Sequence, residues 1–359
     1  MSSEQGASSV IGERAVCICL LLGAAMTAMG QSRQENLNKC QSADPDTRIA
    51  GCAALILAGQ ETPENLSAAY EIRGVAYEDK GDYDHAIPDL NESIRLNPHV
   101  ADSFYSRGIM YNRKGEFDRA IQDYNEAIRL GLSSARVYDS RGHSYRNKGS
   151  YDLAIQDYNN AIRLDANYAG AYNDRGESFF HKGDYGRAIQ GYNEAIRLNP
   201  TSLNAYNNRG LIYLIQNRLT AAIADFEYTI FASLSSSEAA SAALWLDGAS
   251  KRQRFDDAHL LAQVASATDL SKWPGPVLKF DLGQVTAAEL MADALNGDAR
   301  IQSFQVCEAN YFTGEDALFH HQRTTALARL KTARDGCPKG DGAYDAALAE
   351  LKRVGTSAK

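Results

Sequence analysis

The chain repeats itself every 34 residues, and this period constrains its fold more than any other feature. Five successive blocks begin at Ser67, Ala101, Ala135, Ala169 and Leu203. The eighth residue of each block is a glycine: Gly74, Gly108, Gly142, Gly176 and Gly210. The twentieth residue is an alanine: Ala86, Ala120, Ala154, Ala188 and Ala222. Aromatic residues recur at positions 4 and 11, and aromatic residues or leucine at position 24. One copied unit of this length predicts a repeat array.

Each block is predicted to form a helical hairpin. In the third block, Tyr151, Ile155, Tyr158 and Ile162 share one face at helical spacing, and Gly149 before them marks the end of a preceding helix. The small residues at positions 8 and 20 let two helices approach closely, and the aromatic residues fill the layer between hairpins. Because one hairpin cannot bury its apolar face alone, the blocks are expected to stack into an all-α solenoid.

This pattern resembles the tetratricopeptide repeat (TPR) family, whose motif is aromatic-x-x-Leu-Gly-x-x-Tyr followed by Ala-x-x-x-Phe and Pro. The resemblance implies a right-handed superhelix of helical hairpins, with an N-terminal capping helix and a C-terminal TPR-like helical region. The predicted repeats are 67–100, 101–134, 135–168, 169–202 and 203–236. The blocks depart from the motif in having arginine at position 7, and Pro88 is expected to bend the second helix of the first block.

The recurring arginine has a recurring acidic counterpart. Arg73, Arg107, Arg141, Arg175 and Arg209 occupy position 7, and position 23 is aspartate except at Gly191. We expect an internal ladder of ion pairs, Arg141 with Asp157 among them, interrupted at Gly191. The functional alternative is a row of arginines that binds anions.

The first 30 residues are predicted to be a cleaved signal peptide. Ala15 to Met29 form an uncharged apolar run behind Arg14, with small residues at Ala28 and Gly30. The run is shorter than the roughly 20 residues that cross a bilayer, although a retained anchor is the alternative. A lipoprotein would need a cysteine directly after the run, and none follows it. We expect a periplasmic or secreted chain without a stable membrane span.

Removal of the signal peptide leaves four cysteines: Cys40, Cys52, Cys307 and Cys337. An even number in an exported chain predicts disulfides, of which three pairings are possible. Proximity in sequence favours Cys40–Cys52 and Cys307–Cys337. Zinc is less well supported, because the four lack C-x-x-C spacing and suitably spaced histidines. We therefore predict no metal and no cofactor.

The flanks of the repeats are also predicted to be helical. In the capping segment, 31–66, Asp44 and Pro45 begin a helix that ends near Gly59, with Cys40 just before it. The C-terminal region, 237–359, is expected to hold degenerate repeats at 239–272 and 307–340. A capping box at Thr286 to Glu289 opens a further helix between them.

The C-terminal region resembles a more specific family. The stretches KWPGPVLKFDLGQVTAAELMADAL, CEANYFTGEDAL and YDAALAELKRVG resemble, in order, the C-terminal part of NlpI-type envelope TPR proteins. The resemblance implies an adaptor that brings peptidoglycan hydrolases and a periplasmic protease together. Those proteins are lipoproteins, and this chain departs from them in lacking the lipidated cysteine.

In TPR arrays the first helices line a concave groove, and their variable positions face a ligand. The groove positions here predict ten peptide-binding residues: Tyr105, Asn112, Arg113, Arg136, His143, Arg146, Asn173, Asn204, Asn207 and Leu211. We expect the asparagines to bond a peptide backbone, Arg136 and Arg146 to meet acidic groups, and Leu211 to hold an apolar side chain. The alternative is that these are ordinary solvated faces and that C-terminal helices cover Leu211.

Charge and motifs exclude several functions. A net charge of −8 opposes binding to nucleic acid, which needs clustered positive charge. The sequence contains no G-x-S-x-G, P-loop, dinucleotide fingerprint or H-E-x-x-H. We therefore predict a non-enzymatic adaptor of the bacterial cell envelope that binds other proteins or peptides. The alternatives are an enzyme with an active site in residues 237–359 and a purely structural envelope protein.

Overall fold

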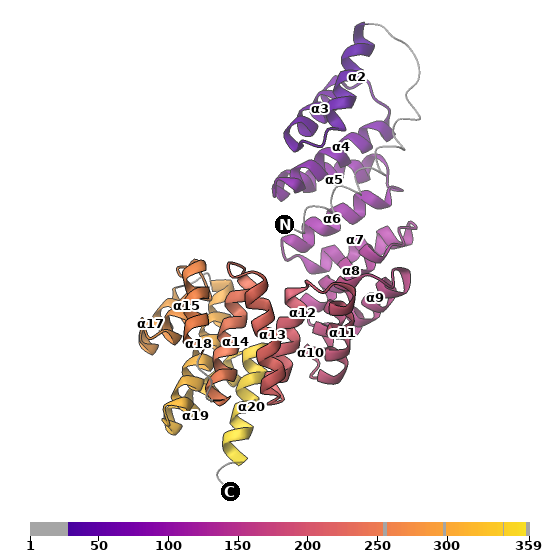
Figure 1. The fold of residues 1–359 in the computed structure, drawn as a ribbon. Helices are drawn as coiled ribbons and strands as arrows, with labels where there is room; N and C mark the ends of the chain where they lie inside the picture. Colours follow the sequence, from indigo (N-terminus) through magenta and orange to yellow (C-terminus); the bar gives the residue numbers. More distant parts are fainter. Residues whose placement is uncertain (1–27, 254–256, 297–298, 340, 357–359) are drawn as a thin grey trace. The chain divides into compact units, whose positions relative to one another are not determined.

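The computed structural model describes residues 28–253, 257–296, 299–339 and 341–356 (Figure 1). These residues form helices α2 to α20 and no strand, so the predicted all-α fold is confirmed. The predicted signal peptide lies outside the described residues, apart from Ala28 to Gly30, which begin α2. Among the described helices, none combines the length and the apolarity that a bilayer span requires. The chain divides into two compact units: unit 1 ends at Lys148, and unit 2 begins at Gly149.

Unit 1 consists of a two-helix segment followed by repeat hairpins. Its described helices are α2 (Ala28–Cys40), α3 (Pro45–Ala58), α4 (Pro63–Asp79), α5 (Tyr83–Leu96), α6 (Ala101–Arg113), α7 (Phe117–Arg129) and α8 (Ala135–Asn147). Helices α4 and α5 pack as one hairpin, and α6 and α7 as the next. The turns within these hairpins use Gly81 and Gly115 at φ 72° and 76°, a conformation that favours glycine.

The segment before the repeats holds two helices where the sequence predicted one. The expected helix is α3, which Asp44 caps by accepting from the backbone N–H of Thr47, and which ends at Gly59. Cys40 lies just before α3, as predicted, and is the last residue of α2. It pairs with Cys52 as predicted, with 4.6 Å between their Cα atoms. The disulfide therefore joins the two helices of this segment.

Unit 2 holds the remaining repeat helices and ends in a larger helical region. Its described helices are α9 (Tyr151–Leu164), α10 (Ala169–His181), α11 (Tyr185–Leu198), α12 (Leu203–Ile215), α13 (Leu219–Ala232), α14 (Ser237–Gln253), α15 (Ala258–Ala267), α16 (Gly275–Asp281), α17 (Ala287–Leu295), α18 (Ala299–Phe319), α19 (Arg323–Gly336) and α20 (Gly342–Thr356). The predicted capping box is present at α17, where Thr286 and Glu289 bond reciprocally.

The repeated glycine at position 8 makes room for the repeated ring at position 24. A Cβ atom added at Gly210 would lie 2.7 Å from Cε1 of Phe226, and one added at Gly108 would lie 2.7 Å from Cε1 of Tyr124. Both rings are fully buried. The ring of the second helix therefore sits directly on the glycine of the first, which explains why both recur in phase.

The arginine ladder is present within each unit. Arg73 pairs with Asp89, Arg107 with Asp123 and Arg209 with Asp225, each at 2.7 Å. A further bond from Arg107 reaches Asn91 in the preceding repeat, and one from Arg209 reaches Asn193. Each of these two arginines therefore joins both helices of its own hairpin to the hairpin before it. The pair between Arg141 in unit 1 and Asp157 in unit 2 stays a prediction.

The ladder is interrupted at Gly191, as expected. Arg175 bonds Asn159, but its buried Nε has no acceptor among the described residues. A Cβ atom at Gly191 would lie 2.8 Å from the carbonyl oxygen of Tyr172. The two helices approach too closely here for an aspartate, and the arginine loses its partner.

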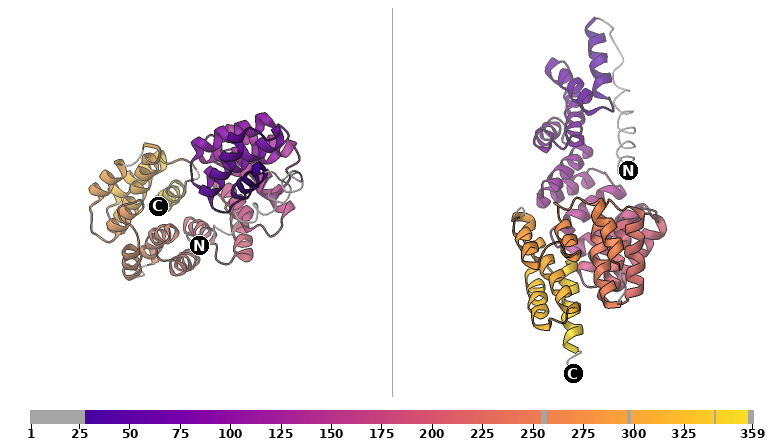
Figure 2. Two further views of the ribbon diagram at one scale, coloured as in Figure 1. Left: turned by 90° about the horizontal axis from the view of Figure 1, so that it is seen from above. Right: turned by 60° about the vertical axis from the view of Figure 1, so that its left-hand side comes forward.

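The C-terminal helix α20 lies on the inner side of unit 2 (Figure 2). It contacts α12, α18 and α19. At its first residue, Gly342, an added Cβ atom would lie 2.8 Å from Cδ2 of Leu211. Further along, the buried carboxylate of Glu350 is 2.9 Å from Arg252. Helix α20 is therefore an integral part of the core of unit 2.

Candidate binding site

The first helices of successive hairpins line the inner side of the array. In unit 2, α10 contacts α12, and α12 contacts α14. Helix α14 begins at Ser237, 34 residues after the start of α12, so it continues the array in phase. Helix α14 begins two residues before the predicted degenerate repeat at 239–272. This placement puts Asn204, Asn207 and Leu211 of α12 opposite Glu238, Ser241 and Trp245 of α14.

A pocket of about 280 Å³ lies between α12 and α14. Its lining residues are Asn204, Asn207, Asn208, Leu211, Ser237, Glu238, Ser241 and Trp245. The volume is close to the lower end of the range for small-ligand sites and is sufficient for one or two side chains of a peptide. Three predicted groove residues, Asn204, Asn207 and Leu211, are thus brought together at one site.

Asn207 fixes the geometry of the pocket. Its Nδ2 donates a hydrogen bond of 2.8 Å to the backbone carbonyl of Glu238 in the first turn of α14. Since the amide donor is used within the protein, Asn207 positions α14 against α12. Asn204 is exposed and Asn208 is half-buried on the same helix. The side-chain amides of Asn204 and Asn208 are therefore available to form hydrogen bonds with the backbone of a peptide.

The floor of the pocket is apolar and closely packed. Trp245 is only 9% exposed, and its ring packs against Tyr311 and Phe312 with centroids 5.3 and 5.2 Å away. Leu211 lies beside it and also contacts the start of α20 at Gly342. The expected alternative, that a C-terminal helix covers Leu211, therefore holds for part of this side chain. The rest of Leu211 remains in the pocket lining.

Several carboxyl groups near the start of α20 are held partly neutral by burial. Burial raises the pKa of Asp345 to about 6, although a hydrogen bond with Tyr185 lowers it. Burial also raises the pKa of Glu308 to about 8, although the hydrogen bond from Trp273 lowers it in part.

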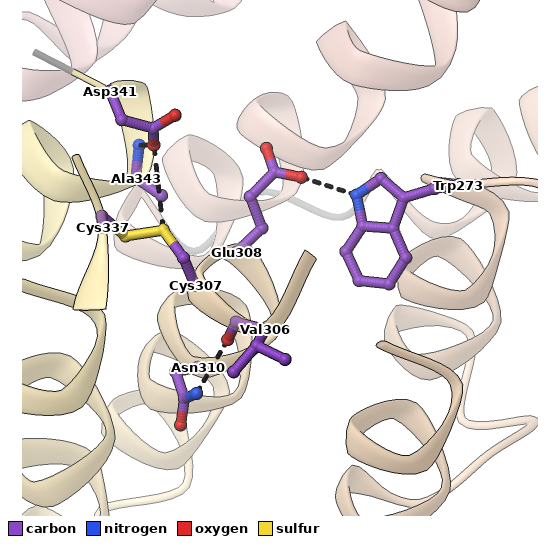
Figure 3. The surroundings of a disulfide bond; sticks show 8 residues. All are labelled: Trp273, Val306, Cys307, Glu308, Asn310, Cys337, Asp341 and Ala343. Atoms are coloured by element: carbon purple, nitrogen blue, oxygen red, sulfur yellow. Dashed lines mark hydrogen bonds between the residues drawn. A yellow bond between two sulfur atoms is a disulfide. The ribbon is translucent and has the colours of Figure 1, made fainter. Parts of the chain in front are cut away.

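The predicted disulfide between Cys307 and Cys337 is present next to Glu308. The Cα atoms of the two cysteines are 5.2 Å apart (Figure 3).

In unit 1 most of the predicted groove residues bond to neighbouring helices or to one another. The Tyr105 hydroxyl on α6 is 3.3 Å from Ser140 Oγ on α8, and Asn112 accepts from Ser144. His143 lies 3.2 Å from a guanidinium nitrogen of Arg146. These contacts tie α6 to α8 and order the α8 surface. Arg113 and Arg136 are exposed, as a contact with an acidic ligand would require.

In unit 2 the remaining predicted residue is Asn173 on α10, whose Nδ2 bonds the neighbouring Asp174 carboxylate at 3.2 Å. It is not part of the pocket lining. The sequence reasoning missed Glu238, Ser241 and Trp245. Asn204, Asn207 and Leu211 are positions 2, 5 and 9 of the block that begins at Leu203. A next block begun 34 residues later, at Ser237, would have placed Glu238, Ser241 and Trp245 at the same three positions.

Comparisons with known proteins agree with this architecture. The family model described as TPR repeat matches residues 142–183 and 176–217, and the model described as tetratricopeptide repeat matches residues 73–135. None of the curated proteins matches the sequence significantly.

Solved structures share the fold. PilF of Pseudomonas aeruginosa is 17% identical, with a TM-score of 0.51, over 62% of this chain and 98% of that one. PilW, described as a type IV pilus biogenesis factor, is 15% identical, with a TM-score of 0.50, over 56% of this chain and 93% of that one. A structure of MamA is 26% identical over 44% of this chain and 93% of that one, with a TM-score of 0.42. From the matched repeats and this shared fold, we conclude that residues 73–135 and 142–217 of the chain are tetratricopeptide repeats.

Proposed function

We propose that this protein is a non-enzymatic adaptor of the bacterial cell envelope that holds a peptide segment of a partner protein on the inner face of unit 2. The observation that carries the proposal is the pocket between α12 and α14, which combines an apolar floor with amide and hydroxyl groups on its rim. Such a lining suits an extended peptide, because the rim groups bond the backbone while the floor receives a side chain.

The envelope location rests on the cysteines and on the apolar run near the N-terminus. All four cysteines outside that run are paired in disulfides, which persist in oxidising compartments. The resemblance of the C-terminal stretches to NlpI-type proteins supports envelope proteins as the partners, cell-wall enzymes or a protease among them. The repeat fold supports a scaffold rather than an enzyme, since it presents an extended surface.

Site-specific photo-cross-linking tests the proposal. A benzoylphenylalanine at Asn208, in the pocket, is compared in cells with one at Gln190, exposed on α11. We expect discrete protein adducts from position 208 that position 190 does not give, and mass spectrometry then identifies them. Identical products from both positions, or no adduct from position 208, would contradict the proposed site.

A further inference from the structure

We propose that the pocket between α12 and α14 selects a basic side chain, lysine or arginine, of the bound peptide. The inference rests on the proposed function and specifies its ligand. Among the lining residues Glu238 carries the single formal charge, and the lining contains neither lysine nor arginine. A carboxylate in a partly enclosed site favours a cation and repels an acidic group.

The Glu238 carboxylate has no ion pair with any described residue. Its one hydrogen bond there comes from the neighbouring Ser237 hydroxyl, at 3.1 Å. The residue is half-buried at the rim of the pocket. Asp225 and Glu194 of the repeats, by contrast, each have an arginine partner. The Glu238 carboxylate is therefore available to accept a cation from a ligand.

Asn207 holds the backbone at Glu238 in place. The bond from its Nδ2 to the Glu238 backbone carbonyl fixes the first turn of α14 against α12. A fixed backbone limits where the side chain can reach, so less conformational entropy is lost when the carboxylate meets a cation. Asn207 is thus a positioning residue for the segment that carries Glu238.

The rest of the pocket suits the long aliphatic stem of a basic residue. Glu238, Ser241 and Trp245 are spaced by three and four residues and so share one face of α14. Leu211 faces them from α12. A side chain lying along this face meets an apolar surface at Trp245 and a carboxylate at Glu238.

Selection from a library of random dodecapeptides displayed on phage tests the inference. The full-length protein is compared with Glu238→Gln and with the control Glu194→Gln, which removes a carboxylate on the outer helix α11. We expect the wild type and the control to enrich peptides with lysine or arginine at one fixed position. The Glu238→Gln variant should bind the selected peptides at least about ten-fold more weakly, as expected for the loss of one charge-assisted bond.

The outcomes distinguish the peptide-binding site itself from its preference for a basic residue. Selected peptides without a basic preference, or equal binding by Glu238→Gln, would overturn the basic-residue specificity while leaving the peptide site intact. If the wild type enriches no peptide at all, the peptide site itself is overturned, and the specificity falls with it.

Discussion

Arg107 and Asp123 form a two-point ion pair, in which Nε and Nη2 donate to the two carboxylate oxygens at 2.8 and 2.7 Å. The side chain of Asp123 is 7% exposed and that of Arg107 18%. The same pairing recurs between Arg209 and Asp225 in unit 2. The position-7 arginine therefore belongs to the repeat fold, and the anion-binding alternative is not needed to explain it.

This pair is predicted to couple strongly in a double-mutant cycle. Either Arg107→Ala or Asp123→Ala leaves a buried charge without its partner, so each should lower the free energy of unfolding by about 3 kcal/mol. The double variant should lose clearly less than the sum, with a coupling energy of about 1 kcal/mol or more. Urea unfolding followed by circular dichroism measures the three variants.

The exposed pair Lys114 and Asp84 is the control for that cycle. It also joins two hairpins, at 2.7 Å, but its side chains are 34% and 85% exposed. We expect a coupling energy of no more than about 0.5 kcal/mol. Equal coupling in the two cycles would show that burial does not strengthen the arginine ladder.

Gly210→Ala is predicted to destabilise unit 2. The added methyl group would overlap the buried ring of Phe226, and overpacking of this kind costs about 1–3 kcal/mol. The control is Gly336→Ala at the end of α19, where nothing lies within 4 Å of the added atom. That change should be neutral or slightly stabilising. A Tm of Gly210→Ala equal to that of the wild type would refute the tight packing of ring on glycine.

Glu308 is predicted to make the protein less stable at alkaline pH. Burial raises the pKa of this carboxyl from 4.5 to about 8, so between these values the folded chain keeps a proton that the unfolded chain has released. Stability on this account is greatest below pH 4.5 and falls as the pH rises through 8.

Glu308→Gln removes this ionisable group while keeping its shape. Compared with the wild type, it should raise the free energy of unfolding at pH 8.5 by about 1 kcal/mol or more, with a smaller difference at pH 5. Urea titrations at the two pH values measure this, with Glu194→Gln as the exposed control. A gain that does not depend on pH would show that Glu308 titrates normally.

The Cys307–Cys337 disulfide is predicted to stabilise the hairpin of α18 and α19. It closes a loop of 30 residues, for which restriction of the unfolded chain gives about 3–4 kcal/mol. Replacement of both cysteines by alanine should lower Tm, and dithiothreitol should lower the Tm of the wild type in the same way. If the double variant loses no stability, the bridge has no structural role in this hairpin.

Most of the repeat fold was predictable from sequence because its constraints are local and recur in phase. Gly108 and Tyr124 occupy fixed offsets, so one hairpin explains the others. Helix α2 was missed because its sequence, AMGQSRQENLNKC, has no clear apolar face. What holds it is the disulfide of Cys40 and the contact with α3, and neither follows from periodicity.

The site was predictable only in part. Asn204, Asn207 and Leu211 followed from the groove positions of a repeat whose phase was clear. Trp245 did not, because the motif weakens after α13 and the glycine of position 8 is replaced by Leu244. The partial cover of Leu211 by α20 depends on how unit 2 folds back on itself, which no local pattern encodes.

The most direct test of the adaptor site uses Trp245 as a reporter. The chain has 2 tryptophans, so Trp273→Phe leaves Trp245 alone in the floor of the pocket. A peptide selected by the wild type is titrated into this variant, and its binding is measured independently by fluorescence anisotropy of the labelled peptide.

We predict a saturable change in Trp245 emission with the same Kd as the anisotropy. Ser241→Arg, which fills the pocket and places a cation in it, should abolish both signals, whereas Gln190→Arg on the outer helix should change neither. Peptide binding that leaves Trp245 emission unchanged and tolerates Ser241→Arg would place the partner elsewhere and contradict the account.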